Sequence, residues 1–196
     1  SVLVILTGIV AGFNIVKMGR IGDEIEIIAE RQMPLTEAVT EITISQLTQG
    51  IWFERALRFS KFSKESGDDA KERFEIAKQS FEKRIESVED AIKKAESIAE
   101  NAVESLEKRE LRNAFEEILE HLKQIEKEHE TYEEHVLQAF SRITQGNVDE
   151  AMRISENAER ESKELNNELK LFLRNIEKFT EESSLRAYQD ETEAVR

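Results

Sequence analysis

An uninterrupted apolar stripe between residues 111 and 143 is the feature that most constrains how this chain can fold. Apolar residues and one histidine recur there at alternating steps of four and three, and Glu and Lys fill most positions between them. This spacing is typical of a helix that buries one narrow face against other helices. The stripe consists of Leu111, Phe115, Ile118, Leu122, Ile125, His129, Tyr132, Val136, Ala139 and Ile143.

The same period recurs in residues 74–106 and 148–179, and a looser version runs through residues 25–59. Gly67 followed by Asp68, and Gly146 followed by Asn147, predict helix ends and tight hairpins, because Gly favours the position after a helix and Asp or Asn the start of the next. The remaining turn, near residues 104–110, has no Gly or Pro. We therefore expect an all-α, up-down-up-down antiparallel four-helix bundle, with helices at about 19–65, 68–104, 110–145 and 148–196.

Composition agrees with this fold and excludes one class of partner. The 196 residues include only one Pro and seven Gly, too few turn formers for a β fold. The formal net charge of -14 repels phosphate backbones, so nucleic acid is not expected as a partner. The absence of Cys removes disulfides and thiol chemistry but does not indicate a compartment.

The first 16 residues carry no charge, in contrast to the rest of the chain. We interpret residues 1–18 as the C-terminal part of a membrane-spanning helix, continuous with the first bundle helix, and residues 19–196 as an extracytoplasmic sensor domain. A cleaved signal peptide is one alternative, although no basic start or cleavage site is visible. A buried helix that packs against copies of itself, as in a filament subunit, is the other.

Helix lengths support an anchored bundle. The first helix from Gly19 to Lys64 has about 45 residues, or roughly 70 Å, and the fourth, from Val148, is about as long. The second and third helices, at about 36 residues or some 54 Å each, turn back before they reach the level of the membrane. A second membrane span after Arg196 is the simplest completion.

Several strings resemble the extracytoplasmic four-helix-bundle region of bacterial methyl-accepting chemotaxis receptors. They are "ERQMPLTEAVTEITISQLTQGIWFERALRF", "EILEHLKQIEKEHETYEEHVLQAF", "ITQGNVDEA" and "NIEKFTEESSLRAYQDETEA". The resemblance implies a ligand-sensing, signal-transmitting homodimer through the first and fourth helices, anchored in the inner or plasma membrane with its bundle on the periplasmic side. Its partner is a small organic ligand or a ligand-loaded binding protein. A sensor histidine kinase ectodomain and a structural filament subunit remain alternatives.

Five residues of the first helix are candidate ligand contacts. Gln46 and Gln49 stand where the helix otherwise shows Leu and Ile, which indicates either a ligand-facing patch or a polar layer that fixes register in a dimer. Trp52, Arg55 and Arg58 form a cationic patch on an acidic molecule. Arg guanidinium groups can grip a carboxylate through two hydrogen bonds, although pairing with surface Glu is the commoner arrangement.

Catalysis, cofactors and metal sites are not expected. A di-iron bundle needs two Glu-x-x-His pairs on separate helices, whereas only Glu126 and His129 fit that spacing, and His121 and His135 lie on the same helix. His129 falls on the apolar stripe, which favours a buried, hydrogen-bonded histidine. Pro34 predicts a kink or break between a membrane-proximal stalk and the bundle, because Pro removes a helical hydrogen bond.

Overall fold

The computed structural model describes the backbone of residues 25–194 and the side chains of residues 25–61 and 68–189. It consists of a π-helical turn, η1 (Ile28–Gln32), followed by α2 (Met33–Ser105), α3 (Arg109–Thr144) and α4 (Val148–Ala194). The predicted membrane segment, residues 1–18, lies outside the described residues. In the part of the chain that is described, no helix is long and apolar enough to cross a membrane.

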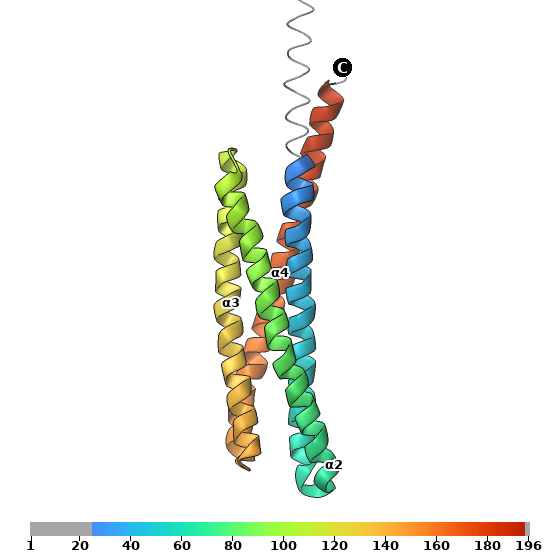
Figure 1. Cartoon of the computed structure of the whole chain (residues 1–196), viewed down its shortest axis with the longest axis vertical. Coiled ribbons are helices and arrows are strands. Elements are labelled where there is room, and N and C mark those ends of the chain that lie inside the picture. Colours follow the sequence, from blue (N-terminus) through green and yellow to red (C-terminus); the bar gives the residue numbers. More distant parts are fainter. Residues whose placement is uncertain (1–24, 195–196) are drawn as a thin grey trace, which may run out of the picture.

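α2 supplies two of the four legs of the bundle. Figure 1 shows its first arm (residues 33–61, blue to teal) running down the molecule and its second arm (residues 68–105, green) returning beside it. Contacts between the arms confirm this pairing: the Phe53 and Phe81 rings have centroids 6.3 Å apart, and Lys94 Nζ lies 4.0 Å from Glu41 Oε2. With α3 and α4 the two arms form the expected all-α four-helix bundle.

The two hairpin turns predicted from glycine differ in outcome. Gly146 has φ +81°, and its N–H bonds Ile143 C=O while the N–H of Asn147 bonds Arg142 C=O. These two bonds form the Schellman turn that ends many helices, as predicted. The predicted stop at Gly67 is wrong, because α2 is helical without a gap through the reversal. The turn without Gly or Pro is an extended stretch, residues 106–108.

Pro34 causes an irregularity but not a break. The N–H of Met33 bonds the carbonyl of Ile28, five residues back, so η1 holds one residue more per turn than an α-helix. Pro34 then occupies the start of α2, where its missing N–H costs little. The looser helical period of residues 25–59 predicts that Ile25 and Ile28 lie on the core face with Leu35, but Ile25 is 55% exposed. The extra residue in η1 explains this difference, since it rotates Ile25 away from the face that Leu35 continues.

Buried apolar residues fall into two clusters along the bundle. The proximal cluster, toward the 106–108 turn, is aliphatic and centred on Leu35, Ile92, Leu122 and Leu169. The distal cluster, toward the α2 reversal, contains five aromatic rings among small and aliphatic side chains and includes Phe53, Phe81, Tyr132, Phe140 and Ala158. Its rings meet edge-on, with Phe81 and Phe140 centroids 5.4 Å apart and planes at 89°.

The start of the first helix and the end of α4 lie side by side at one end of the bundle. Gln32 Nε2 donates to Ser183 Oγ at 3.0 Å, and both residues are buried. Figure 1 shows α4 (red) continuing beyond the level of the turn between α2 and α3. Among the described residues, α4 is therefore the leg that reaches farthest at this end (Figure 1).

The core can be tested at Leu122, which is fully buried in the proximal cluster. We expect Leu122→Ala to lower the free energy of unfolding by about 2 to 5 kcal/mol, because truncation leaves a cavity. Leu137→Ala on the same helix is the control, since Leu137 is 39% exposed. Urea unfolding followed by circular dichroism measures both, and equal losses would contradict the assigned core face.

Candidate functional site

A layer of buried polar side chains separates the proximal and distal clusters. Gln46 and Gln49 project into it from the first arm of α2, His129 and Glu133 from α3, and Ser162 from α4. Gln46 and Gln49 are 0% exposed within a single chain. The interpretation of these glutamines as the polar layer of a dimer seam is therefore wrong, because they face the interior of one bundle.

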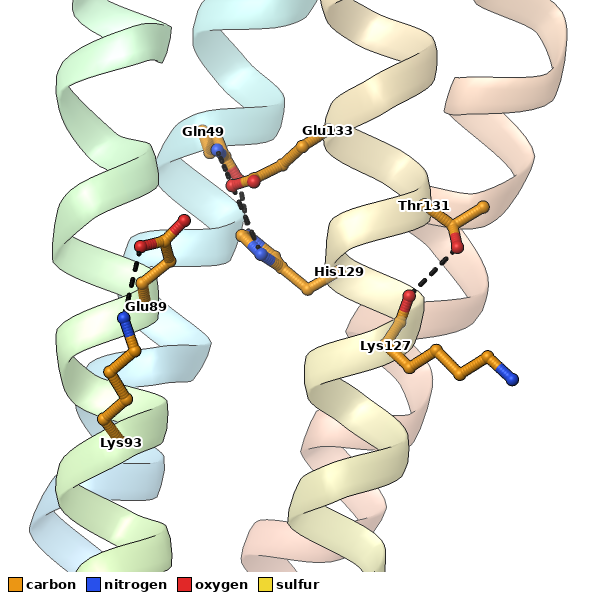
Figure 2. Close-up of polar contacts among 7 residues, drawn as sticks. All are labelled: Gln49, Glu89, Lys93, Lys127, His129, Thr131 and Glu133. Carbon is orange, nitrogen blue, oxygen red and sulfur yellow. Dashed lines mark hydrogen bonds and ion pairs between the residues drawn. The ribbon is translucent and has the colours of Figure 1, made fainter.

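Three of these side chains form a closed triangle of polar contacts. Figure 2 shows Gln49 reaching from α2 to His129 and Glu133 on α3. His129 Nε2 lies 3.0 Å from Gln49 Oε1, and Gln49 Nε2 donates to Glu133 Oε1 at 3.1 Å. His129 Nδ1 lies 3.2 Å from the same Glu133 oxygen. The triangle ties the first arm of α2 to α3 and holds both glutamine atoms in place.

The triangle requires one proton between His129 and Glu133. Since Gln49 Oε1 can only accept, His129 Nε2 donates to it, and the contact between Nδ1 and Glu133 needs a proton on one side. Burial lowers the pKa of His129 to about 4. Burial, together with Glu89 and Glu130, raises the pKa of Glu133 to about 7 despite the bond from Gln49. As the pH falls, Glu133 therefore takes up a proton before His129 does, and His129 stays neutral beside it.

Lys93 lies beside Glu89, one of the two carboxylates that raise the pKa of Glu133. Its Nζ lies 3.5 Å from Glu89 Oε2 one helical turn away on the second arm of α2, and both side chains are half-exposed (Figure 2). Such exposed pairs are screened by solvent and contribute little. Burial is accordingly the main reason why Glu133 holds its proton.

Gln46 is the unusual member of the layer. It is fully buried, yet neither its Oε1 nor its Nε2 has a hydrogen-bond partner. The antiparallel pairs Gln32–Ser183 and Gly50–Ser162 place Gln46 at the level of Asn166 on α4, whose Oδ1 is also unpartnered. An unsatisfied buried amide lowers the free energy of unfolding by about 1 to 3 kcal/mol. The unpartnered atoms of Gln46 and Asn166 therefore reduce stability at this level of the core.

Gly50 has a packing reason for its place in the helix. A Cβ at this position would lie 3.3 Å from Ser162 Oγ. The first arm and α4 therefore approach closely beside the polar layer, and Gly50 permits this approach although glycine costs about 1 kcal/mol in a helix interior.

The structure does not bring the five predicted ligand contacts together. Gln46 and Gln49 are interior, whereas Arg55 and Arg58 are exposed, and Trp52 is half-buried. The Arg55 guanidinium lies over the Trp52 ring, 4.5 Å from its centroid. This cation–π contact accounts for one arginine of the patch, and the ligand role of these residues stays a prediction.

His121 and His135 lie on the flanks of the α3 stripe, each half-buried beside an α4 carboxylate. His121 Nε2 lies 2.9 Å from Glu168 Oε1, and His135 Nδ1 lies 2.7 Å from Glu161 Oε2. His129, in contrast, is buried with hydrogen-bond partners, as the sequence predicted. Among the described residues, no group of three His, Asp or Glu side chains is placed to hold a metal ion.

Glu133 is the site residue that sequence reasoning missed. It lies one helical turn after His129, a spacing that places two side chains on one face. The stripe predicted His129 as an inward residue, and the i, i+4 relation was the available signal for its partner. Glu133 was not recognised because isolated glutamates on such a helix usually face solvent.

Comparisons with known proteins find no match for this chain among family models, curated proteins or solved structures.

The shared proton can be tested through two variants with opposite pH dependence. In His129→Gln, Glu133 is left with a folded-state pKa above its usual 4.5, so the folded state binds the proton more tightly. The stability of this variant should then rise as pH falls from about 7 to 4.5. In Glu133→Gln, His129 keeps a folded-state pKa below 6.5, and stability should fall as pH falls from 6.5 to about 4.

In each variant the free energy of unfolding should change by roughly 3 kcal/mol across the pH range given, at about 1.4 kcal/mol per pH unit. In the parent the two effects offset each other between about pH 4.5 and 6.5, because folding moves one proton from His129 to Glu133. Urea unfolding at a series of pH values measures the slopes, with exposed Glu134→Gln as the control. Slopes of the same sign in both variants would show that the proton is not shared as described.

Proposed function

We propose that this chain is the ligand-sensing and signal-transmitting region of a transmembrane receptor of the methyl-accepting chemotaxis type, working as a homodimer. The observation that carries the proposal is the end of the bundle where the first helix and α4 lie side by side, joined by the bond from Gln32 to Ser183. The other two legs turn back there at residues 106–108. Two helices that are joined side by side at one end of a bundle suit transmission of a small movement from one to the other.

An exposed apolar row on the first arm supports the dimer. Ile44, Leu47 and Ile51 are 58%, 39% and 50% exposed and follow steps of three and four residues. This is the spacing by which one helix packs along another. Exposed apolar residues in a contiguous row mark interaction surfaces more often than scattered ones do. A second copy packed along the same row would cover it.

The receptor proposal can be tested with a hybrid protein. The full chain, joined after Arg196 to the second membrane helix and output region of a well-characterised chemoreceptor, should control the associated histidine kinase. We expect a small organic ligand or a ligand-loaded binding protein to change kinase activity. A hybrid that assembles in the membrane but stays locked under every ligand, or a chain that forms filaments, would instead favour a structural role.

The dimer can be tested by disulfide crosslinking, because the chain contains no Cys. We expect Leu47→Cys in the full chain to form a disulfide-linked dimer under mild oxidation, since equivalent positions approach each other across a two-fold helix pair. Ile76→Cys is the matched control, an apolar residue 51% exposed on the second arm. Non-reducing electrophoresis measures both, and equal crosslinking of the two variants would contradict the proposed face.

A further inference from the structure

The triangle formed by Gln49, His129 and Glu133 joins two legs of the bundle. His129 and Glu133 both lie on α3, whereas Gln49 lies on the first arm of α2 (Figure 2). The contacts of Gln49 with His129, at 3.0 Å, and with Glu133, at 3.1 Å, therefore connect the legs. The third contact, at 3.2 Å between His129 Nδ1 and Glu133 Oε1, lies within α3. A triangle of hydrogen bonds needs a hydrogen in each of these contacts.

Neutral His129 and an ionised Glu133 supply too few hydrogens for the triangle. A neutral imidazole carries one N–H, a carboxylate carries none, and the Gln49 amide turns its NH₂ group to one partner and its oxygen to the other. Whichever nitrogen of His129 carries the hydrogen, and whichever way the amide is turned, at least one contact joins two acceptors, which repel each other. The triangle is complete only when it holds one further proton.

When that proton is absent, the contact that fails is one between the legs. A carboxylate accepts a hydrogen bond more strongly than an amide oxygen does, so the single imidazole hydrogen moves to Nδ1 and bonds Glu133 within α3. His129 Nε2 then carries a lone pair, and this lone pair faces Gln49 Oε1 across 3.0 Å. Gln49 keeps its bond to Glu133 but loses its bond to His129. Loss of the proton therefore weakens the hold of α3 on the first arm.

The surroundings of Glu133 place this change near neutral pH. The polar layer and its charged neighbours come from all four legs: Gln49 from the first arm, Glu89 with Lys93 from the second arm, His129 and Glu130 from α3, and Ser162 from α4. Burial, and then the charges of Glu89 and Glu130, raise the pKa of Glu133 to about 7. Burial lowers the pKa of His129 to about 4, so His129 does not compete for the proton. Glu133 is accordingly the member of the triangle that changes charge between about pH 6 and 8.

We propose that the triangle is a pH-operated contact: one bound proton completes it between the first arm of α2 and α3, and loss of that proton breaks it at Gln49. Gln49 lies between Leu47 and Ile51 of the exposed row, so a change in how the first arm is held at this level reaches that row. The contact does not depend on the receptor proposal, because it lies within one chain and requires neither a dimer nor an output region.

Nitrogen NMR of the full chain, with ¹⁵N-labelled histidine, tests the proton count directly. An imidazole nitrogen that carries hydrogen has a chemical shift far from that of one that does not, and His129→Gln identifies the His129 signals among the three histidines. We expect His129 to carry hydrogen on Nε2 at about pH 6 and on Nδ1 at about pH 8, with a midpoint near the pKa of Glu133, about 7.

Two variants separate the triangle from other groups that titrate in this range. Glu133→Gln cannot lose the proton, so His129 should carry its hydrogen on the same nitrogen at both pH values. His135→Gln removes the histidine beside Glu161 of α4 and, as the matched control, should leave the His129 midpoint unchanged. A parent protein in which His129 keeps one nitrogen protonated throughout, or an equal change in Glu133→Gln, would overturn the proposal.

Trp52 reports whether the change reaches the first arm. It is the single Trp of the chain, follows Gln49 by one helical turn and packs against the distal cluster. We expect its fluorescence to change between about pH 6 and 8 with the midpoint found by NMR, and to stay constant over this range in Glu133→Gln. His135→Gln should behave as the parent does. Constant fluorescence in the parent, or the same change in Glu133→Gln, would show that the proton does not control the first arm.

Discussion

The contact among Gln49, His129 and Glu133 determines much of the remaining architecture. A buried histidine and a buried glutamate are tolerated here because they share one proton and because a glutamine from another helical leg bonds both. Removing any member would leave a polar group without a partner, which costs more than the bond contributes. The triangle therefore permits only one register between the first arm of α2 and α3. The aliphatic and aromatic clusters on either side pack in the register that it specifies.

The helices and their inward faces could be predicted from the sequence because each long helix repeats one pattern many times. The stripe containing Leu122 and His129 predicted α3, and Gly146 with Asn147 predicted its end. The reversal of α2 was harder, since a glycine can allow a helix to end without requiring it. Ile25 was placed on the wrong face because the pattern assumes a constant number of residues per turn, whereas η1 contains an extra one.

The polar contacts between helices were less predictable than the inward faces of the helices, because each contact depends on side chains from separate legs of the bundle. The inward position of Gln49 follows from its spacing, but its bond to Glu133 joins residues 84 positions apart. The bond from Gln32 to Ser183 likewise depends on where α4 lies relative to the first helix, which no local pattern specifies. The exposed arginines gave the clearest chemical signal in the sequence, yet Arg55 stacks on Trp52 and the unpartnered polar atoms lie elsewhere.

The extra residue in η1 also determines the rotation, about the helix axis, of the residues before η1 relative to those after it. One residue of an α-helix corresponds to about 100° around its axis, so residues 25–27 are offset by that angle from the pattern of the bundle. The bond in question joins the N–H of Met33 to the carbonyl of Ile28. If this bonding pattern moved by one position along the chain, one residue would turn to a different face of the helix while α2, α3 and α4 kept their packing. The rotation of residues 25–27 about the helix axis is thus separable from the register of the core. It can change at η1 without any sliding of the helices that pack below.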